Sequence, residues 1–505
     1  MTAPASILAA LAAHAAEVPD RPLLRFGDLT YSRAGTLHLA AAWASRLRAE
    51  GVQPGDRVAL FLANSAAFVG AYLGVHLAGA IAVLVNTQYR QVELDHILRD
   101  SGAILCVTDS SGERELAALG ESHEGAPPDL RCSLVVERDA PRPSLTRRAP
   151  LPPLPAADAP AIIAYTSGTT GRSRGAVLLH RNLIANALAV TQAWHWDARD
   201  RLLLMLPLFH AHGLCVGIHG TISVGAFADV RPKFDAAEAL DTLLNGEPTM
   251  FFGVPTMYGR LIAEARARAA APPGLRLYVS GSAPLGVQTF EEFRALTGQA
   301  ILERYGMTET IMNCTNPYDG ERRPGSVGGP FPGQEARIVD VVTRRPMHDE
   351  TPGEIQVRGP HVFPGYWRNE GATVEAFDAE GWFNTGDLGW RSADGYFTIS
   401  GRARELIISG GFNIYPREVE EVLLTHPGIA DVAVYGLPDA DFGEQVAAAV
   451  VRAPGCAVTD DEIVEYCRAR LASYKKPRRV SFVADLPRNA MGKVQKHILR
   501  ERANA

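Results

Sequence analysis

Short apolar runs alternate with helical stretches between Arg57 and Asp109, and this alternation constrains the fold more than any other feature of the chain. The apolar runs are RVALFLA, AIAVLVN and AILCVTD, and the stretches between them are AAFVGAYLGVHLAG and QVELDHILRDSG. This pattern is typical of parallel strands joined by crossover helices. It resumes further along in LLLMLPLF, TMFFGVP and LRLYVSGSAPL. We therefore expect an α/β fold with parallel-type sheets.

The pattern of residues along the chain changes twice toward its C-terminal end. From about Ser326, Gly-rich short runs such as GEIQVRGPHV and GWFNTGDLGWRSADGYFTISGR predict a β-rich subdomain with hairpin turns. After Gly401, helices at EVEEVLLTH and DEIVEYCRARLAS and strands at DVAVYGL and QVAAAVV predict a separate α+β unit. A chain of 505 residues is too long for one core, so we expect a large domain over residues 1–401 and a small one over residues 402–505. The Pro- and Arg-rich segment Arg138–Pro160 is interpreted as an exposed connection.

Charge and cysteine content exclude several classes of protein. A formal net charge of -6 argues against a general nucleic-acid binder, which carries a basic excess. The six cysteines form no CxxC pair and no zinc-ligand spacing, so we expect reduced thiols. The N-terminal run SILAALAAHAAEVPDRP lacks the basic start of a signal peptide, and no apolar run is long enough to span a bilayer. A cytoplasmic enzyme is expected, with an organelle matrix as the alternative.

The segment Ile162–Gly175, IIAYTSGTTGRSRG, combines glycines, hydroxyls and two arginines directly after an apolar run. Glycine lets backbone N–H groups approach an anion, and the hydroxyls and guanidinium groups add donors and charge. The run AVLLHRNLIANALAV that follows predicts a helix whose N-terminus would also favour an anion. The GxxxxGK[ST] order of a Walker loop is absent. We interpret the segment as a phosphate-binding loop, the alternative being a solvated linker.

The segment ILERYGMTET, Ile301–Thr310, places an aromatic ring, a glycine, a hydroxyl and a carboxylate where a strand is predicted to end. Ligands bind at that edge of open α/β sheets. Magnesium takes hard oxygen ligands and commonly combines one or two carboxylates with substrate phosphate, which suits Glu309. The alternative is a buried Tyr305 beside a surface glutamate.

Together these segments resemble the adenylate-forming superfamily, which includes acyl-CoA synthetases, luciferases and peptide-synthetase adenylation domains. The resemblance covers nearly the whole chain. It implies ATP with Mg2+, CoA as co-substrate, and a small C-terminal domain that moves about a hinge near Ala403–Glu405, with Arg404 at the hinge position. It also implies two steps, in which an acid and ATP give an acyl-adenylate and CoA then displaces AMP.

The resemblance implies roles for individual side chains. Tyr305 is expected to stack on adenine and Thr308 to bond the α-phosphate, while Glu309 and Thr166 hold the metal. Asp387 in NTGDLG and Arg402 are expected on the ribose, and SGSAPL provides small residues around adenine. The ATP site implied in this way comprises Thr166, Ser167, Gly168, Thr169, Thr170, Gly171, Arg174, Gly281, Ser282, Ala283, Arg304, Tyr305, Asp387 and Arg402. The loop departs from the superfamily pattern, because Ser173-Arg174-Gly175 stands where Pro-Lys-Gly is usual.

Two C-terminal segments carry the remaining chemistry. LPRNAMGKVQK matches the catalytic-lysine segment and assigns that role to Lys493, which would bridge carboxylate and α-phosphate oxygens. ISGGFNIYPREVE matches the segment that lines the path of the CoA arm, with Gly410 and Gly411 close to it. Residues 473–502 are also rich in Lys and Arg, which predicts either attraction of CoA phosphates or a solvated basic face.

The acyl site is expected to contain His210, Arg260, Ser282 and Met307, with His210 counted among the catalytic residues beside the acyl group. A buried guanidinium calls for an anionic partner, so an inward-facing Arg260 favours a small dicarboxylate. MFFGVPTMYGRL, ERYGMTETIMNCTNPYDG, GGFNIYPREVE and LPRNAMGKVQK are similar to malonyl-CoA synthetases, which implies malonate or methylmalonate as the acid.

Three alternatives remain: a short- or medium-chain acyl-CoA synthetase with Arg260 in solvent, a peptide-synthetase adenylation domain, and a noncatalytic nucleotide-binding protein. The joint presence of Glu309, Asp387 and Lys493 opposes the last of these. The sequence leaves the oligomeric state open between monomer and dimer.

Overall fold

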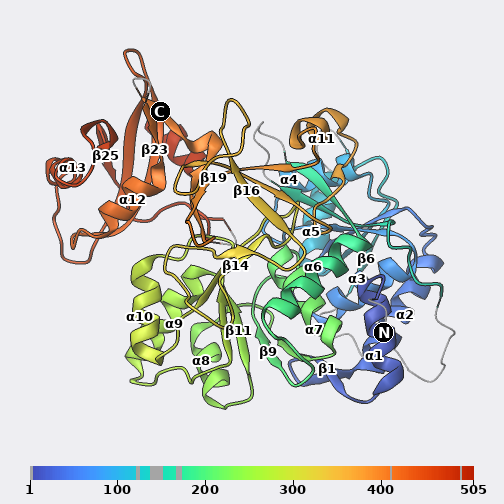
Figure 1. The fold of residues 1–505 in the computed structure, drawn as a ribbon. Helices are drawn as coiled ribbons and strands as arrows, with labels where there is room; N and C mark the ends of the chain where they lie inside the picture. Colours follow the sequence, from blue (N-terminus) through green and yellow to red (C-terminus); the bar gives the residue numbers. More distant parts are fainter. Residues whose placement is uncertain are drawn as a thin grey trace.

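The computed structural model describes residues 4–120, 125–136, 152–166, 173–409, 412–489 and 492–504, and two large sheets form its framework (Figure 1). The seven-stranded sheet has the order β18-β8-β7-β4-β3-β5-β6. Its strands are β3 (Arg57–Phe61), β4 (Ile81–Leu84), β5 (Leu105–Thr108), β6 (Cys132–Val135), β7 (Pro160–Thr166), β8 (Arg174–Leu179) and β18 (Gly365–Tyr366). The pairs among β3, β4, β5, β6 and β7 are parallel, which confirms the α/β expectation for this part of the chain.

The nine-stranded sheet has the order β15-β14-β13-β12-β11-β9-β10-β1-β2. Its strands are β1 (Pro22–Phe26), β2 (Leu29–Ser32), β9 (Arg201–Leu204), β10 (Phe227–Val230), β11 (Met250–Gly253), β12 (Leu277–Ser280), β13 (Leu302–Tyr305), β14 (Cys314–Thr315) and β15 (Gly329–Pro330). The pairs from β1 through β10, β9, β11 and β12 to β13 are parallel, whereas β2 and β14 pair antiparallel at the two ends of this run. The three apolar runs expected as strands after the phosphate loop form β9, β11 and β12.

Helices cover both faces of each sheet. One apolar cluster joins side chains of both sheets with those of α1 (Ile7–Glu17), α2 (Arg33–Ala49), α3 (Ala66–Leu77) and α6 (His180–Ala193), so these helices form the central layer. The outer face of the seven-stranded sheet packs on α4 (Gln91–Ser101) and α5 (Ser110–Gly120). The outer face of the other sheet packs on α8 (Ala236–Leu244), α9 (Pro255–Ala267) and α10 (Val287–Thr297). A π-helix, η1 (His212–Ile218), leads directly into α7 (His219–Val224).

One expectation beside the phosphate loop is wrong. The helix predicted over AVLLHRNLIANALAV begins only at His180, because Arg174–Leu179 forms β8, antiparallel to β7. The run Ala176–Leu179 is buried throughout, as in a strand covered on both faces, and a short apolar run does not distinguish such a strand from a helix. The loop therefore joins two strands of a hairpin, and no helix N-terminus follows it directly.

The β-rich subdomain is confirmed as an antiparallel sheet of β16 (Glu335–Val339), β17 (Gly353–Arg358), β19 (Phe383–Arg391) and β20 (Phe397–Arg402), with α11 (Glu370–Ala376) nearby. After it, η2 (Ala403–Glu405) leads into the C-terminal unit, which Figure 1 places to one side of the larger body. That unit contains β21 (Ile407–Ser409), β22 (Phe412–Ile414), β23 (Ile429–Asp439), β24 (Gly443–Arg452) and β25 (Arg479–Phe482), with α12 (Pro416–Leu424), α13 (Asp460–Arg468), η3 (Ser473–Lys475) and α14 (Lys496–Asn504). Within the described ranges, no helix combines the length and the apolar character that a membrane crossing requires.

Candidate active site

The carboxyl ends of β12 and β13 meet at one edge of the nine-stranded sheet. The two strands pair in parallel through Ser280 and Glu303, and each then passes into a turn that carries predicted site residues. Gly281, Ser282 and Ala283 follow β12, while Met307, Thr308 and Glu309 follow β13. Ser282 has a φ of +69°, a left-handed conformation that a serine adopts rarely and that is enriched at functional sites. The structure thus brings both turns to the edge where open α/β sheets bind ligands.

Asp387, Arg402 and Tyr305 form a buried polar group beside this edge. Asp387 in β19 lies opposite Arg402 in β20, and the Arg402 Nε is 2.6 Å from the Asp387 Oδ1. The Tyr305 hydroxyl donates to the other oxygen of the Asp387 carboxylate. Asp387 raises the pKa of Arg402 further above its ordinary value. The three residues expected on the nucleoside of ATP are therefore in direct contact.

Glu309 is a buried carboxylate whose hydrogen-bond partners are hydroxyls. The Tyr366 hydroxyl donates to its Oε1 at 3.1 Å, and the Thr166 hydroxyl donates to the same atom at 3.4 Å. Burial raises the pKa of Glu309 above its ordinary value. Within the described ranges, no cluster of three or more His, Cys, Asp and Glu side chains could hold a metal. The donor set fits Mg2+, which accepts one carboxylate and takes further oxygens from phosphate and water.

The strand ends that flank the phosphate loop reach this site from the seven-stranded sheet. Thr166 ends β7 and pairs with Arg174, the first residue of β8. The Arg174 guanidinium carbon lies 5.8 Å from the centre of the Tyr366 ring. Ser167, Gly168, Thr169, Thr170 and Gly171 lie outside the described residues. The two ends of the loop nevertheless place a hydroxyl and a cation beside Glu309 and Tyr366.

A second polar group lies around Arg304, which was expected among the ATP contacts. Its side chain is 3% exposed, and its Nε and Nη2 are among the buried polar atoms without a hydrogen-bond partner in the described residues. The ideal Cβ of an alanine at position 281 would lie 2.5 Å from the Arg304 guanidinium carbon, so a larger residue there would require the guanidinium to shift. Burial lowers the pKa of Arg304 to about 9, which still leaves it charged at neutral pH.

Two histidines accompany Arg304. Desolvation lowers the pKa of His210 to about 4 and that of His212 well below its ordinary value, and the Arg304 charge lowers both further. Both rings are therefore neutral at pH 7. The His212 Nδ1 and the Ser282 hydroxyl share a 3.3 Å hydrogen bond, while the His212 Nε2 is buried without a partner in the described chain. The π-helix that begins at His212 is of a kind often found at functional sites.

Arg260 does not have the surroundings expected for it. It lies in the second turn of α9, whose Pro255 start agrees with the sequence expectation, but its side chain is exposed. An exposed Arg260 lacks the burial that the argument from the sequence assumed, and Arg304 is another arginine that has this burial. Met307, also expected at the acyl site, is partly buried, and the Tyr305 hydroxyl lies 3.9 Å from its sulfur.

Lys493 lies on a short hairpin of the C-terminal unit. Its backbone N–H donates to the Asn489 Oδ1 at 3.0 Å, and Arg488 forms an isolated bridge with Val494. The hairpin reaches the larger body, since a Cβ added at Gly492 would lie 3.0 Å from the hydroxyl of Thr256 in α9. Gly410 and Gly411 lie outside the described residues, and so does the side chain of Arg404 in η2.

His212 and Tyr366 were not predicted from the sequence. A signal for His212 existed, because LPLFHAHG contains two histidines and only the first was chosen. Tyr366 belongs to the two-residue strand β18, and its place beside Glu309 results from pairing with β8 across a long sequence separation. No local pattern indicates such a contact.

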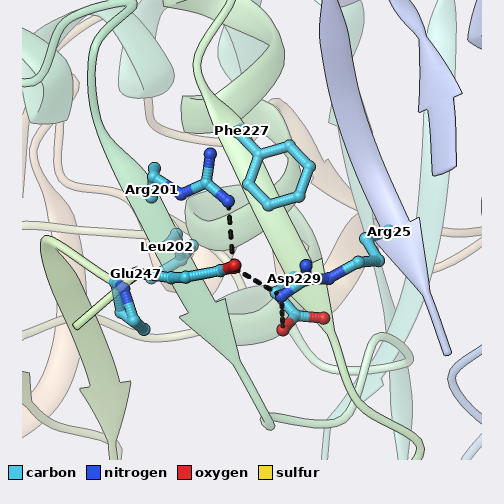
Figure 2. Close-up of a pocket in the computed structure, with 7 residues that line it drawn as sticks. Arg25, Arg201, Leu202, Phe227, Asp229 and Glu247 are labelled. Atoms are coloured by element: carbon cyan, nitrogen blue, oxygen red, sulfur yellow. Dashed lines mark hydrogen bonds and ion pairs between the residues drawn. The ribbon is translucent and has the colours of Figure 1, made fainter. Parts of the chain in front are cut away.

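A small hollow at the opposite edge of the nine-stranded sheet is a weaker candidate. Arg25, Arg201, Asp229 and Glu247 line it together with Phe227, and Figure 2 shows the charged groups turned toward one another. Arg25 pairs with Asp229 at 2.6 Å and with Glu247 at 2.9 Å, and Arg201 pairs with Glu247 at 3.0 Å. The charges compensate one another, and the hollow lies at the amino ends of β9 and β10, away from the ligand edge.

Comparison with known proteins identifies the class that this fold and site define. The model of the AMP-binding enzyme family matches residues 11–367, and the model of the AMP-binding enzyme C-terminal domain matches residues 418–493. The chain belongs to the AMP-binding enzyme family, and it is an acyl-CoA ligase of the adenylate-forming type.

Individual relatives are CoA ligases whose names give different acids. The chain is 37% identical to a sulfoacetate–CoA ligase of Cupriavidus necator, over 97% of this chain and 96% of that protein. It is 34% identical to the mitochondrial malonate–CoA ligase ACSF3 of Mus musculus, over 94% of this chain and 86% of that protein. Among solved structures, ATP-bound MatB from Rhodopseudomonas palustris superposes with a TM-score of 0.90 at 39% identity, covering 99% of both chains.

Proposed function

We propose that this ligase activates malonate, and its methyl-substituted form, to the CoA thioester. In the first step one malonate carboxylate attacks the α-phosphorus of ATP, forming malonyl-adenylate and releasing pyrophosphate. In the second step the thiol sulfur of CoA attacks the adenylate carbonyl and loses its proton, and AMP leaves. The relatives named for malonate and for sulfoacetate both use a short acid with a second anionic group, which supports this substrate class.

The observation that carries the proposal is the buried, incompletely paired guanidinium of Arg304. A buried charge without a partner is strongly destabilising, whereas a planar guanidinium bonds a carboxylate through two parallel hydrogen bonds. The second carboxylate of malonate would provide this partner, one methylene away from the carboxylate that reacts. The neighbouring Glu303 raises the pKa of Arg304 electrostatically, but an aliphatic acid would leave the Nε and Nη2 of Arg304 without an acceptor.

The neutral histidines suit the same ligand. Because His210 and His212 carry no charge at pH 7, they can complete the hydrogen bonding of an anion without adding a second cation. The unpartnered His212 Nε2 and the buried Ser280 hydroxyl are available for that purpose among the described atoms. Ser282, held by His212, and the partly buried Met307 would bound the short acyl chain.

The other groups would bind ATP. We assign Asp387 and Arg402 to the ribose, Tyr305 to adenine and Thr308 to the α-phosphate. The loop from Thr166 to Arg174, together with Gly281 and Ala283, would enclose the nucleotide. Glu309 with Thr166 would hold Mg2+, which would neutralise phosphate charge when bound.

The C-terminal unit would supply both Lys493 and the CoA contacts. We assign residues 1–401 and 402–505 to two domains with the hinge at Arg404, and Lys493 to the bridge between malonate and the α-phosphate. Phe412 and Tyr474 stack with ring centres 4.4 Å apart on the surface of this unit, near the segment that contains Gly410 and Gly411. Arg478 lies 3.8 Å from the centre of the Phe442 ring. Stacked aromatic rings and cations suit the nucleotide part of CoA.

The test is a substrate panel with wild-type protein and the Arg304→Met variant. The panel comprises malonate, methylmalonate, sulfoacetate, succinate, butyrate and octanoate, assayed for CoA thioester formation. We expect wild type to prefer malonate, and Arg304→Met to lower kcat/KM for malonate by about 30-fold or more, roughly 2 kcal/mol, the lower range for truncating a buried charge pair. Butyrate should be used equally well or better by the variant.

Arg260→Ala is the matched control, because it removes an exposed guanidinium and should change malonate turnover by less than about threefold. If wild type prefers sulfoacetate, the second anionic group of the natural acid is a sulfonate and not a carboxylate. A preference for butyrate or octanoate, or full malonate activity in Arg304→Met, would reject the dicarboxylate and favour a short- or medium-chain ligase.

A further inference from the structure

Helix α4 holds both ends of the phosphate loop. The His96 Nε2 lies 2.8 Å from the carbonyl oxygen of Ser173, which directly precedes β8. The Tyr165 hydroxyl, near the end of β7, donates to the Asp100 Oδ2 at 2.6 Å. His96 and Asp100 are four residues apart on α4 and so project from the same face of the helix. One helix face therefore contacts the strand that enters the loop and the residue that leaves it.

Neighbouring contacts tighten this arrangement. The His96 and Tyr165 rings meet edge to face, with centres 5.9 Å apart. The Trp367 indole N–H donates to the Asp100 carbonyl at 3.2 Å, and the Trp367 backbone N–H donates to the Gly175 carbonyl at 2.7 Å. Through these two hydrogen bonds, Trp367 connects α4 to β8 independently of His96. All of these side chains are partly buried, where hydrogen bonds are less exposed to competition from water.

The two ends of the phosphate loop that α4 contacts carry side chains assigned to the ATP site. Thr166 follows Tyr165, and its hydroxyl donates to Glu309 at 3.4 Å. Arg174 follows Ser173, and its guanidinium lies over the Tyr366 ring. A shift of either stem would move Thr166 or Arg174 relative to Glu309.

We propose that His96 and Asp100 are positioning residues for the triphosphate of ATP. His96 donates from Nε2 to the Ser173 carbonyl and sets the place of Arg174, while Asp100 accepts from Tyr165 and sets the place of Thr166. Neither side chain touches the nucleotide. The proposal rests on the assignment of this loop to ATP, but it does not depend on which acid is activated.

A purely structural role would make a different prediction. If the contacts only attached α4 to the sheet, their loss would weaken the binding of all nucleotides to the same extent, or would lower only the melting temperature. If they position the loop ends, their loss weakens ligands that carry β- and γ-phosphates and spares AMP, which lacks both.

The test compares nucleotide binding by calorimetric titration for wild type, His96→Ala, His96→Gln and Tyr165→Phe. We expect His96→Ala and Tyr165→Phe each to raise the Kd for Mg–ATP about fivefold, the effect of one net hydrogen bond, and to change the Kd for AMP by less than about twofold. The KM for pyrophosphate in ATP–pyrophosphate exchange should rise in parallel. His96→Gln retains a side-chain N–H and should return the Kd for Mg–ATP to within about twofold of wild type.

Val92→Ala is the control on the same helix, because Val92 is 82% exposed. Equal weakening of ATP and AMP, unchanged ATP binding, or a His96→Gln variant as weak as His96→Ala would overturn the proposal. If His96→Ala does not fold, Tyr165→Phe and His96→Gln decide the question. These titrations contain no acid. If wild type binds ATP but does not use malonate, the proposed substrate is wrong and the positioning role of His96 and Asp100 is unaffected.

Discussion

Glu309 illustrates how a single residue constrains the chemistry. It is 5% exposed and hydrogen-bonded to two hydroxyls, and burial raises its pKa. A carboxylate in that setting gains most from a hard cation that shares its oxygens with substrate phosphate.

Glu309→Gln tests the metal assignment at the scale of one residue. The amide keeps the shape of the side chain and removes its charge, so the Mg2+ concentration for half-maximal ATP–pyrophosphate exchange should rise by about tenfold or more while the melting temperature is retained. Asp229→Asn, a buried carboxylate at the far edge of the sheet, should leave the Mg2+ requirement unchanged. A Glu309→Gln variant with the Mg2+ dependence of wild type would remove Glu309 from the metal site.

At the scale of an element, the hairpin that carries Lys493 is held by a defined ion pair. The Arg488 Nη1 donates to the Gly492 carbonyl at 2.6 Å, and the Arg488 Nη2 pairs with the Asp431 Oδ2 of β23 at 2.5 Å. An exposed ion pair usually contributes little to stability, but a guanidinium with both arms engaged restricts the geometry of the loop it spans. We therefore expect Arg488 to affect the placement of Lys493 more than the stability of the fold.

Separate assays of the two half-reactions test the roles of Lys493 and Arg488. Lys493→Ala should lower acyl-adenylate formation by about 100- to 1,000-fold, the effect of removing one donor from a developing charge, and Arg488→Ala by about tenfold. Both variants should retain thioester formation from supplied acyl-adenylate, since that step does not need the lysine bridge. Arg470→Ala, which removes an exposed cation of the same unit, should affect neither step. Equal loss of both half-reactions in Lys493→Ala would refute its assigned role.

At the scale of the whole molecule, the central helical layer contains a cluster of buried neutral histidines. His76 and His180 pack edge to face with ring centres 4.7 Å apart, and the His219 Nε2 is 2.9 Å from the Tyr72 hydroxyl. Burial lowers the pKa of His180 to about 4 and that of His219 to about 3, and it lowers the pKa of His76 as well. These groups stay neutral while the chain is folded and bind protons when it unfolds.

This cluster predicts acid sensitivity of the fold. Because the folded pKa values lie below the unfolded value near 6.5, stability is complete above pH 6.5 and falls as the pH decreases toward 4 and 3. Each such histidine should remove roughly 2 kcal/mol of unfolding free energy at pH 5. Thermal melting between pH 7.5 and 5 should show the decline, and His180→Gln should make it shallower. His195→Gln, at a histidine whose side chain is 60% exposed, should not, and a flat wild-type profile would contradict the prediction.

The local sequence determined the strands and the turns between them. Periodicity predicted β3, β4 and β5 as parallel strands, and a strand end was predicted within Ile301–Thr310, where β13 ends at Tyr305. Such signals are local because backbone conformation depends mainly on near neighbours along the chain. The same locality explains the failure at Ala176–Leu179, where a buried run fits a strand and a helix equally well.

The tertiary structure alone decided which side chains are buried together. Arg260 and Arg304 are both arginines beside a predicted strand or helix end, yet packing leaves the first in solvent and buries the second, which belongs to β13. His96 meets Ser173 across 77 positions of sequence, and Tyr366 meets Glu309 across 57. Burial and long-range contact depend on how whole layers pack, and the free energy of a charge depends on that burial, so no local pattern specifies them.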